Sequence, residues 1–263
     1  ESKEEVVDAI RKGELTLSFS ALKAFRESPF HFIQYKTGKK KQTDAMRFGT
    51  LIHSVILEPE KVKDEYLFFI KPKPDNNMSK KENKEAWLQM ETEAIATGKK
   101  LVKQEDYELA KKVGELVRTN AAAKHILDRC FRFEHKVKWS LEDFNWRGII
   151  DGQGTNMILD LKKIRDANPE KVKWNARREL WHWQGYLYAL ATNPKNPLST
   201  KYYNLCVCES DLGVSVNEIG WSLLTQAKAE IEVESLPTLK GDRLQLNQLF
   251  LNLFQNALKF HSR

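Results

Sequence analysis

The amino-acid sequence predicts an α/β protein that combines a β-sheet with a large helical region. Residues 147–152 and 157–162 are two apolar runs joined by a glycine-containing turn, which is typical of buried strands. Residues 130–139 alternate between apolar and polar side chains, as a half-exposed strand does. Residues 85–127 and 174–191 instead carry apolar side chains at helical spacing.

Length and charge narrow the class of protein. The chain has 263 residues and 41% hydrophobic residues, enough for one large domain or two small ones with a real core. Its net charge is +7 and its pI is about 9.1, which favours a polyanionic partner. No apolar run reaches the roughly 18 residues that a membrane span needs, and no signal-peptide core follows the charged start. We therefore expect a cytoplasmic protein without membrane association.

The cysteines agree with that location. Cys130, Cys206 and Cys208 are too few, and too unevenly spaced, for a disulfide framework or a four-cysteine metal site. We interpret them as small buried hydrophobic residues.

The first elements are helical. Residues 1–13 predict a charged helix that ends at Gly13. After a short extended piece, Ser18 or Ser20 can cap a second helix, which Ser28-Pro29 ends.

A basic loop separates these helices from the next one. Residues 36–42 carry four lysines and predict either a solvated loop or a rim that contacts phosphate. The next helix is expected to begin near Gly49 and to run to Leu57. It contains His53, and a lone histidine in an apolar helix is more often a satisfied core residue than a metal ligand. Residues 71–84 predict a second basic loop.

The remaining elements alternate between helices and strands. Residues 85–127 predict two helices separated by Gly98. Residues 174–191 predict one long helix rich in aromatic and basic side chains, which either line a nucleic-acid channel or combine a core face with a solvent face. We then expect a turn over 193–197, a strand over 201–208 and a helix over 221–232.

Acidic residues interrupt the two apolar strands. Alternation places Asp160 and Lys162 on one face of their strand, and a hairpin return brings Asp151 close to them. Two carboxylates can anchor Mg²⁺, and a neighbouring lysine can orient a water molecule and offset phosphate charge, which suits hydrolysis of a phosphodiester. The alternative is a structural ion pair, either Asp160–Lys162 or Asp151–Arg147. Glu134, on the polar face of its strand, either lines a cleft or pairs with a lysine across the sheet.

In this order, the segments resemble the RecE-type exonucleases, members of the PD-(D/E)XK nuclease superfamily related to phage lambda exonuclease. The resemblance spans roughly residues 15–230. The matching pieces are Leu17–Ser20, Phe25, Ser28-Pro29, Phe48–His53, Leu57–Pro59, Glu134, Arg147–Asp151, Asp160–Lys162, Gln184 and Tyr188. The resemblance implies a central mixed β-sheet flanked by helices, with an added helical N-terminal and middle region.

The same resemblance implies roles for individual residues. The metal ligands would be His53, Asp151 and Asp160. Lys162 would position or activate water, with Glu134 assisting the metal or the water. Further roles fall to Gln184 and Tyr188, which would brace the site and the DNA backbone, and to Arg47 as a phosphate contact. Independently of the resemblance, Arg177 and Arg178 of the aromatic and basic helix are candidate DNA contacts. Lys163 departs from the family pattern, because threonine often follows the lysine there.

The implied reaction is hydrolysis of one strand of linear double-stranded DNA from its 5′ end, with Mg²⁺ or with Mn²⁺ as a substitute, in phage-type recombination. The implied partners are double-stranded DNA ends, a single-strand annealing protein and further copies of the chain in a ring. An alternative from another class is a catalytically inactive DNA-binding module on the nuclease fold.

The predicted domain organisation is a nuclease domain over residues 1–232, with its core at about 130–210 and its helical region at about 15–127. A tail over 233–263 follows. The tail resembles the N-box of sensor histidine kinases, in which residues matching Asn256 and Lys259 serve ATP. About thirty residues are too few for that domain, so we favour an amphipathic helix over an ATP-binding kinase fragment.

Overall fold

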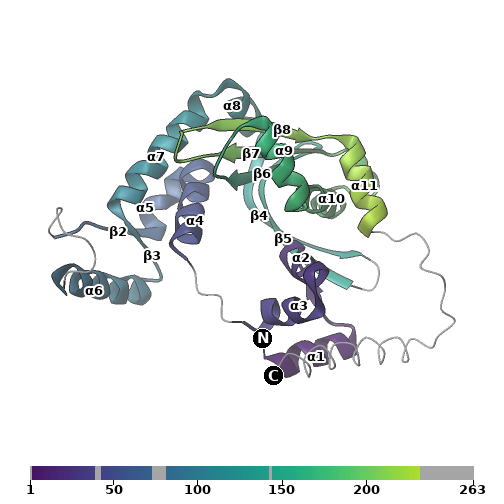
Figure 1. The fold of residues 1–263 in the computed structure, drawn as a ribbon, viewed down its shortest axis with the longest axis horizontal. Helices are drawn as coiled ribbons and strands as arrows, with labels where there is room; N and C mark the ends of the chain where they lie inside the picture. Colours follow the sequence, from purple (N-terminus) through teal and green to yellow (C-terminus); the bar gives the residue numbers. More distant parts are fainter. Residues whose placement is uncertain (1, 39–42, 73–80, 142–143, 232–263) are drawn as a thin grey trace.

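The computed structural model describes residues 2–38, 43–72, 81–141 and 144–231 (Figure 1). A six-stranded sheet runs through its centre in the order β1-β5-β6-β7-β8, and β4 pairs with β5. Pairing is parallel between β1 and β5 and between β6 and β7, and antiparallel elsewhere, so the sheet is mixed. The strands are β1 (Thr16–Leu17), β4 (Cys130–Leu141), β5 (Phe144–Gly154), β6 (Met157–Lys163), β7 (Lys201–Val207) and β8 (Val214–Ile219).

Helices cover both faces of this sheet (Figure 1). On one face Leu159 and Leu161 of β6 pack in a core with α4, α7 and α8. On the other face Ile158 packs in a core with α9, α10 and α11. The helices are α4 (Asp44–Leu57), α7 (Gln104–Thr119), α8 (Ala121–Leu127), α9 (Pro169–Arg178), α10 (Trp181–Thr192) and α11 (Trp221–Ile231). This arrangement confirms the predicted α/β fold with a central mixed sheet flanked by helices.

Two smaller units complete the described chain. One is helical, with Val6 and Phe32 in its core, and consists of α1 (Lys3–Lys12), α2 (Phe19–Glu27) and α3 (Pro29–Thr37). The other pairs β2 with β3 in parallel, and packs α6 against them through Phe69 and Trp87. It consists of η1 (Pro59–Lys61), α5 (Val62–Glu65), β2 (Tyr66–Phe69), α6 (Lys81–Thr97) and β3 (Lys100–Lys103). Elsewhere in the chain, a second 3₁₀ turn, η2 (Pro197–Ser199), precedes β7.

The first two predicted helices are confirmed. Helix α1 ends at Gly13, whose φ of 69° is a left-handed conformation that glycine adopts easily. Ser18 caps α2 by accepting a hydrogen bond from the Ala21 N–H. Helix α3 was not predicted. Ser28 ends α2 and also caps the start of α3.

Several predicted boundaries were wrong. Helix α4 begins at Asp44 and not near Gly49, because Thr43 already caps it with a hydrogen bond from the Met46 N–H. The stretch 85–127, which was expected to hold two helices, contains parts or all of three, α6, α7 and α8, and a strand, β3, that begins at Lys100. Strands β2 and β8 were also missed, and Lys36 lies in α3 and not in a loop. Residues 39–42 and 73–80 of the two predicted basic loops lie outside the described ranges.

The predicted long helix 174–191 is in fact two helices. Leu180 interrupts it with a φ of 58°, a costly backbone conformation for leucine. Leu180 is buried in the core with α9 and α10, so packing holds this conformation in place. Arg177 therefore lies on α9, on a separate helix from Gln184.

The alternation along β4 is only partly as predicted. Val137 is buried, but Phe131 is 59% exposed. The cause is a register shift between Cys130 and Arg132 against β5, which inserts an extra residue into β4. Cys206 and Cys208 are buried and Cys130 is half-buried.

Two expectations concern other parts or properties of the chain. The kinase-like segment falls within residues 232–263, which lie outside the described ranges. Within those ranges, none of the helices has both the length and the apolar character needed to cross a bilayer.

Candidate active site

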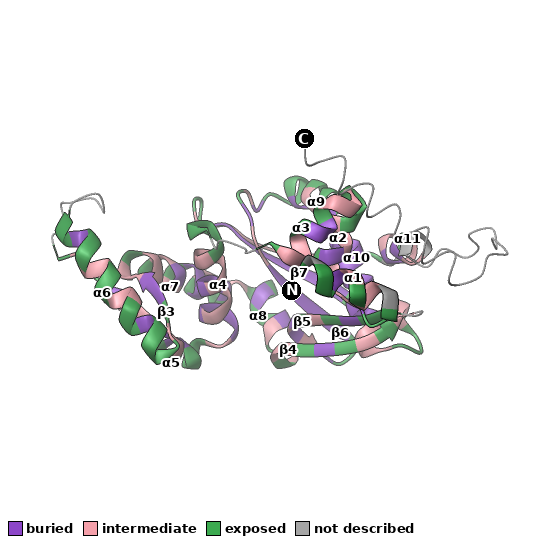
Figure 2. Cartoon of the chain, turned by 90° about the horizontal axis from the view of Figure 1, so that it is seen from below, coloured by how far each residue is buried: buried purple, intermediate pink, exposed green. Residues whose placement is uncertain are grey.

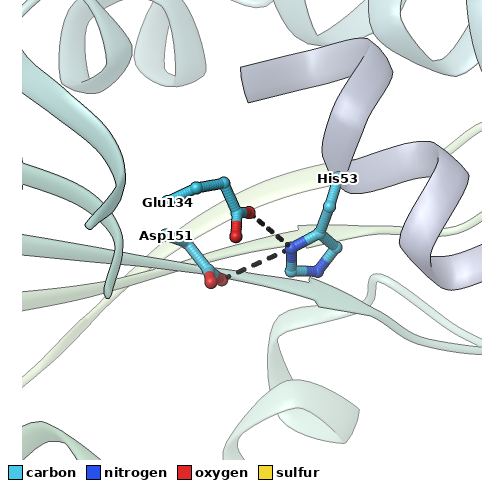
Figure 3. Close-up of side chains that lie close together, drawn as sticks. All are labelled: His53, Glu134 and Asp151. Atoms are coloured by element: carbon cyan, nitrogen blue, oxygen red, sulfur yellow. Dashed lines mark ion pairs between the residues drawn. The ribbon is translucent and has the colours of Figure 1, made fainter. Parts of the chain in front are cut away.

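His53, Glu134 and Asp151 form a compact cluster at the side of β5 (Figure 3). They come from α4, β4 and β5, and their ligand atoms all lie within 4.8 Å of one another. The His53 Nδ1 atom lies 3.5 Å from Glu134 Oε1 and 3.8 Å from Asp151 Oδ2. One imidazole and two carboxylates at this spacing are suitable donors for a divalent cation.

The divergence of two strands explains the position of Asp151. Strand β4 pairs along one edge of β5, while β1 and β6 share the other edge at different ends. Of β5, only Gly152–Gly154 pair with β6, so these two strands part at Asp151. The Leu161 N–H donates a hydrogen bond of 2.6 Å to Asp151 Oδ2. In a regular pair of strands, a backbone carbonyl of the neighbouring strand would accept this bond. Asp151 is thereby fixed at the opening between β5 and β6.

The backbone at Glu134 is strained. Its φ is 47°, in the left-handed region that costs about 1–2 kcal/mol for a residue with a side chain. Glu134 lies opposite Asp151, between the paired residues Phe133 and His135. The strained residue is thus one of the three that converge on the candidate metal site, where such strain is commonly retained.

Helix α4 carries His53 at the border between core and solvent. Leu51, Ile52, Val55 and Ile56 are buried in the core against the sheet. The His53 side chain is 28% exposed, so it faces both the carboxylates and solvent.

Burial and like charge perturb the titration of this cluster. Burial, followed by the Asp160 charge, raises the pKa of Asp151 to about 7, against the opposing effects of His53 and Lys162. Burial acts to lower the pKa of His53, but the hydrogen bond to Glu134 and the Asp151 charge outweigh it and raise this pKa. The site therefore has a surplus of negative charge, which a bound cation would relieve.

A second cluster surrounds Asp160, whose side chain is only 4% exposed. Lys162 Nζ lies 2.7 Å from Asp160 Oδ2. Gln184 Nε2 donates to Asp160 Oδ1 at 2.9 Å, and Asn204 Nδ2 donates to Oδ2 at 3.0 Å. Lys162 and Asp160 therefore share a face of β6, as alternation predicts. Their ion pair is present, whereas Asp151 faces His53 and not Arg147.

Residues of α10 hold Lys162 from the other side. Lys162 Nζ donates to Gln184 Oε1 at 2.9 Å and lies 5.6 Å from the centroid of the Trp181 ring. Tyr188, one turn after Gln184, packs so closely on Gly148 that a Cβ there would lie 2.5 Å from its ring. Burial, followed by the Asp160 charge, raises the pKa of Tyr188. The structure thus brings the predicted residues Gln184 and Tyr188 next to Lys162 and β5.

The predicted DNA contacts lie in two other places. Arg47 forms an ion pair with Asp44 on α4 and lines a hollow of about 230 Å³ together with Trp87 and Lys103. Arg177 and Arg178 lie in the last turn of α9. Arg178 forms an ion pair with Glu179.

Asn204 is a site residue that the sequence did not predict. Asn204 is fully buried and pairs in register with Asp160, across β6 and β7. A signal was available, because Asn204 is the polar exception in the run Tyr202–Val207, just as Asp160 is in β6. Trp181 was expected among the aromatic side chains of the helix 174–191, and the structure places its ring against Lys162.

An imidazole, buried carboxylates and a lysine at the opening of a mixed sheet define an α/β protein with a candidate metal centre. The chain belongs to the family described as PDDEXK-like domain of unknown function (DUF3799), which matches residues 18–193. This membership agrees with the superfamily expected from the sequence. The RecE-type subgroup remains a prediction.

A solved structure supports the same fold. The chain is similar to the crystal structure of a "putative exonuclease" from Eubacterium rectale, with a TM-score of 0.58 and 11% sequence identity. The similarity covers 94% of this chain and 84% of the other. At that identity the likeness shows a shared fold. No curated protein matches the chain.

Proposed function

We propose that this protein is a metal-dependent DNA exonuclease. The observation that carries the proposal is the proximity of two clusters, His53–Glu134–Asp151 and Asp160–Lys162, at the point where β5 and β6 diverge. The family membership and the likeness to a protein described as an exonuclease support the choice of a phosphodiester as the bond that is broken.

The donor set fits a divalent cation. His53, Glu134 and Asp151 would hold it, with Asp160 as a further ligand close enough for its charge to raise the pKa of Asp151 and to affect His53. Carboxylates suit Mg²⁺, and the imidazole makes Mn²⁺ an effective substitute. When bound, such an ion supplies Lewis-acid polarisation of a phosphate oxygen and a lowered pKa for coordinated water.

Lys162 would act on the water or on the scissile phosphate. Asp160, Gln184 and the Trp181 ring fix its ammonium group before any substrate arrives. A fixed cation stabilises developing phosphate charge without a reorganisation cost during the reaction. Gln184 and Tyr188 would brace this arrangement, because Gln184 contacts both Lys162 and Asp160.

The proposed substrate is the end of linear double-stranded DNA, degraded from the 5′ end. Arg47, Arg177 and Arg178 would contact the phosphate backbone, in keeping with the net charge of +7. We further propose that the product strand passes to a single-strand annealing protein, and that several copies of the chain surround the DNA.

The test is cleavage of linear 5′-phosphorylated duplex DNA in Mg²⁺ or Mn²⁺, with covalently closed circular DNA as the matched substrate. We expect release of nucleotides from the linear substrate alone, and loss of this release in Asp151→Asn and on addition of EDTA. Wild-type protein that binds DNA but cleaves neither substrate in either metal would contradict the proposal and favour the inactive DNA-binding module.

A further inference from the structure

Much of helix α9 is exposed (green in Figure 2), and its exposed residues include one tryptophan and several cations. Val172 and Ala176 form the buried stripe of α9 against the core, so the opposite side of this helix faces solvent. Trp174 lies on that side and is 58% exposed. We define the α9 face as Trp174 with the exposed cations Lys171, Lys173, Arg177 and Arg178.

The charge of the α9 face is not neutralised within the described chain. Lys173 pairs with Glu170, and Arg178 pairs with Glu179. Lys171 and Arg177 make no ion pair with any residue in the described ranges. Two cations are thus available to an anionic ligand on either side of Trp174, at spacings of three residues that place them close to it on the helix.

Trp174 already stacks with a cation. The Arg178 guanidinium carbon lies 4.3 Å from the centroid of the Trp174 ring. A flat, cation-bearing indole open to solvent resembles in chemistry the platforms on which proteins stack unpaired nucleic-acid bases.

The C-terminal end of α9 is connected to the candidate active site through the chain. Its last turn is followed by Leu180 and then by Trp181, whose ring contacts Lys162. At the same end, Glu179 forms an ion pair with Lys23 of α2. The end of α9 is thus two residues, Glu179 and Leu180, away in the chain from the side chain that contacts Lys162.

We propose that the α9 face binds single-stranded DNA, with a base stacked on Trp174 and phosphates held by Lys171 and Arg177. The choice of DNA rests on the proposed nuclease function. The choice of a single strand follows from the indole, because base faces inside a duplex are covered by their neighbours and cannot stack on a side chain.

The test is fluorescence anisotropy of a labelled oligonucleotide in EDTA, which prevents cleavage. Trp174→Ala should weaken single-strand binding roughly tenfold, and Trp174→Phe should restore most of it. The double variant Lys171→Gln/Arg177→Gln should lower the slope of log affinity against log salt by about 0.7 for each lost phosphate contact. The matched control is Phe131→Ala, because Phe131 is 59% exposed and has the Arg132 guanidinium carbon 5.8 Å from its ring centroid.

Three outcomes overturn the proposal: Trp174→Ala binds like wild type, it weakens blunt duplex as much as single strand, or Phe131→Ala has an equal effect. Circular dichroism and melting temperature check that each variant folds. The measurement separates this inference from the nuclease proposal. If single-strand binding depends on Trp174 but the protein cleaves no DNA, the α9 proposal is supported and the nuclease proposal is refuted. If the protein cleaves DNA but Trp174→Ala binds single strands like wild type, the nuclease proposal is supported and the α9 proposal is refuted.

Discussion

Asn204 lies directly opposite Asp160 across β6 and β7, and its Nδ2 atom is 3.0 Å from Asp160 Oδ2. Asn204 is fully buried. With Gln184 bonded to the other carboxylate oxygen, the carboxylate of Asp160 is held at both ends by neutral donors. These donors hold the carboxylate in place beside Lys162, which lies 2.7 Å from Oδ2.

Replacing Asn204 tests this support. We expect Asn204→Leu to lower the free energy of unfolding by about 1.5–3 kcal/mol, because a hydrogen bond to a buried charged group is lost. Cleavage should fall as well, since Asp160 is no longer fixed. Urea denaturation and the cleavage assay measure the two effects. Asn217→Leu is the control, because Asn217 pairs with Asn204 in register but bonds to Ser215. Equal effects of the two variants would refute a special role for Asn204.

Lys162 and its neighbour Lys163 offer a matched pair. We expect Lys162→Met to reduce cleavage by roughly 100-fold or more, because a fixed cation at the phosphate is lost. DNA binding should change little. Lys163→Met should keep most of the activity, since Lys163 instead pairs with Glu209 at 2.5 Å. Single-turnover rates at saturating protein measure both variants, and similar rates would contradict the role given to Lys162.

The raised pKa of Asp151 predicts how metal binding depends on pH. The pKa of Asp151 is about 7 in the folded protein and 3.8 ordinarily, so the folded state binds this proton more tightly than the unfolded state does. Without metal, the contribution of Asp151 to the free energy of unfolding is therefore greatest at low pH and is lost as the pH rises from about 4 to about 7. A cation must displace that proton, so the gain in melting temperature on adding Mn²⁺ should grow between pH 5 and pH 8. The affinity should rise up to about tenfold per pH unit below pH 7. A gain of equal size at pH 5 and pH 8, or one retained by Asp151→Asn, would show that the metal binds elsewhere.

Gly148 sets the position of Tyr188. A Cβ at residue 148 would lie 2.5 Å from the Tyr188 ring, whose movement the surrounding core resists. We expect Gly148→Ala to cost about 1–3 kcal/mol of unfolding free energy. Gly220→Ala is the control, because a Cβ there meets nothing within 4 Å. Chemical denaturation compares the two, and a neutral Gly148→Ala would mean that Tyr188 is free to shift.

Local pattern was sufficient for part of this fold. The period of two in Met157–Lys163 correctly places Asp160 beside Lys162, and helix caps such as Ser18 identify where helices begin. Each of these signals is local, because it depends on residues only a few positions apart. The left-handed conformations of Leu180 and Glu134 could not be predicted, because packing and strand pairing impose them against the preference of the residue.

The candidate site depends on contacts between distant segments. His53 and Asp151 are almost one hundred positions apart, and no periodicity relates them. Only the order of the matching segments in the resemblance suggested that they meet. Asn204 was not predicted because it carries no charge, although an amide within an apolar strand is unusual.

The most direct test of the central claim is the position of a bound ion. Crystals grown with saturating Mn²⁺ should show an anomalous peak bonded to His53, Glu134 and Asp151, with metal–oxygen distances of about 2.1 Å or slightly longer. Such a peak should disappear in Asp151→Asn. Crystals of the wild-type protein in which these three side chains hold no ion, under conditions that support cleavage, would contradict the account.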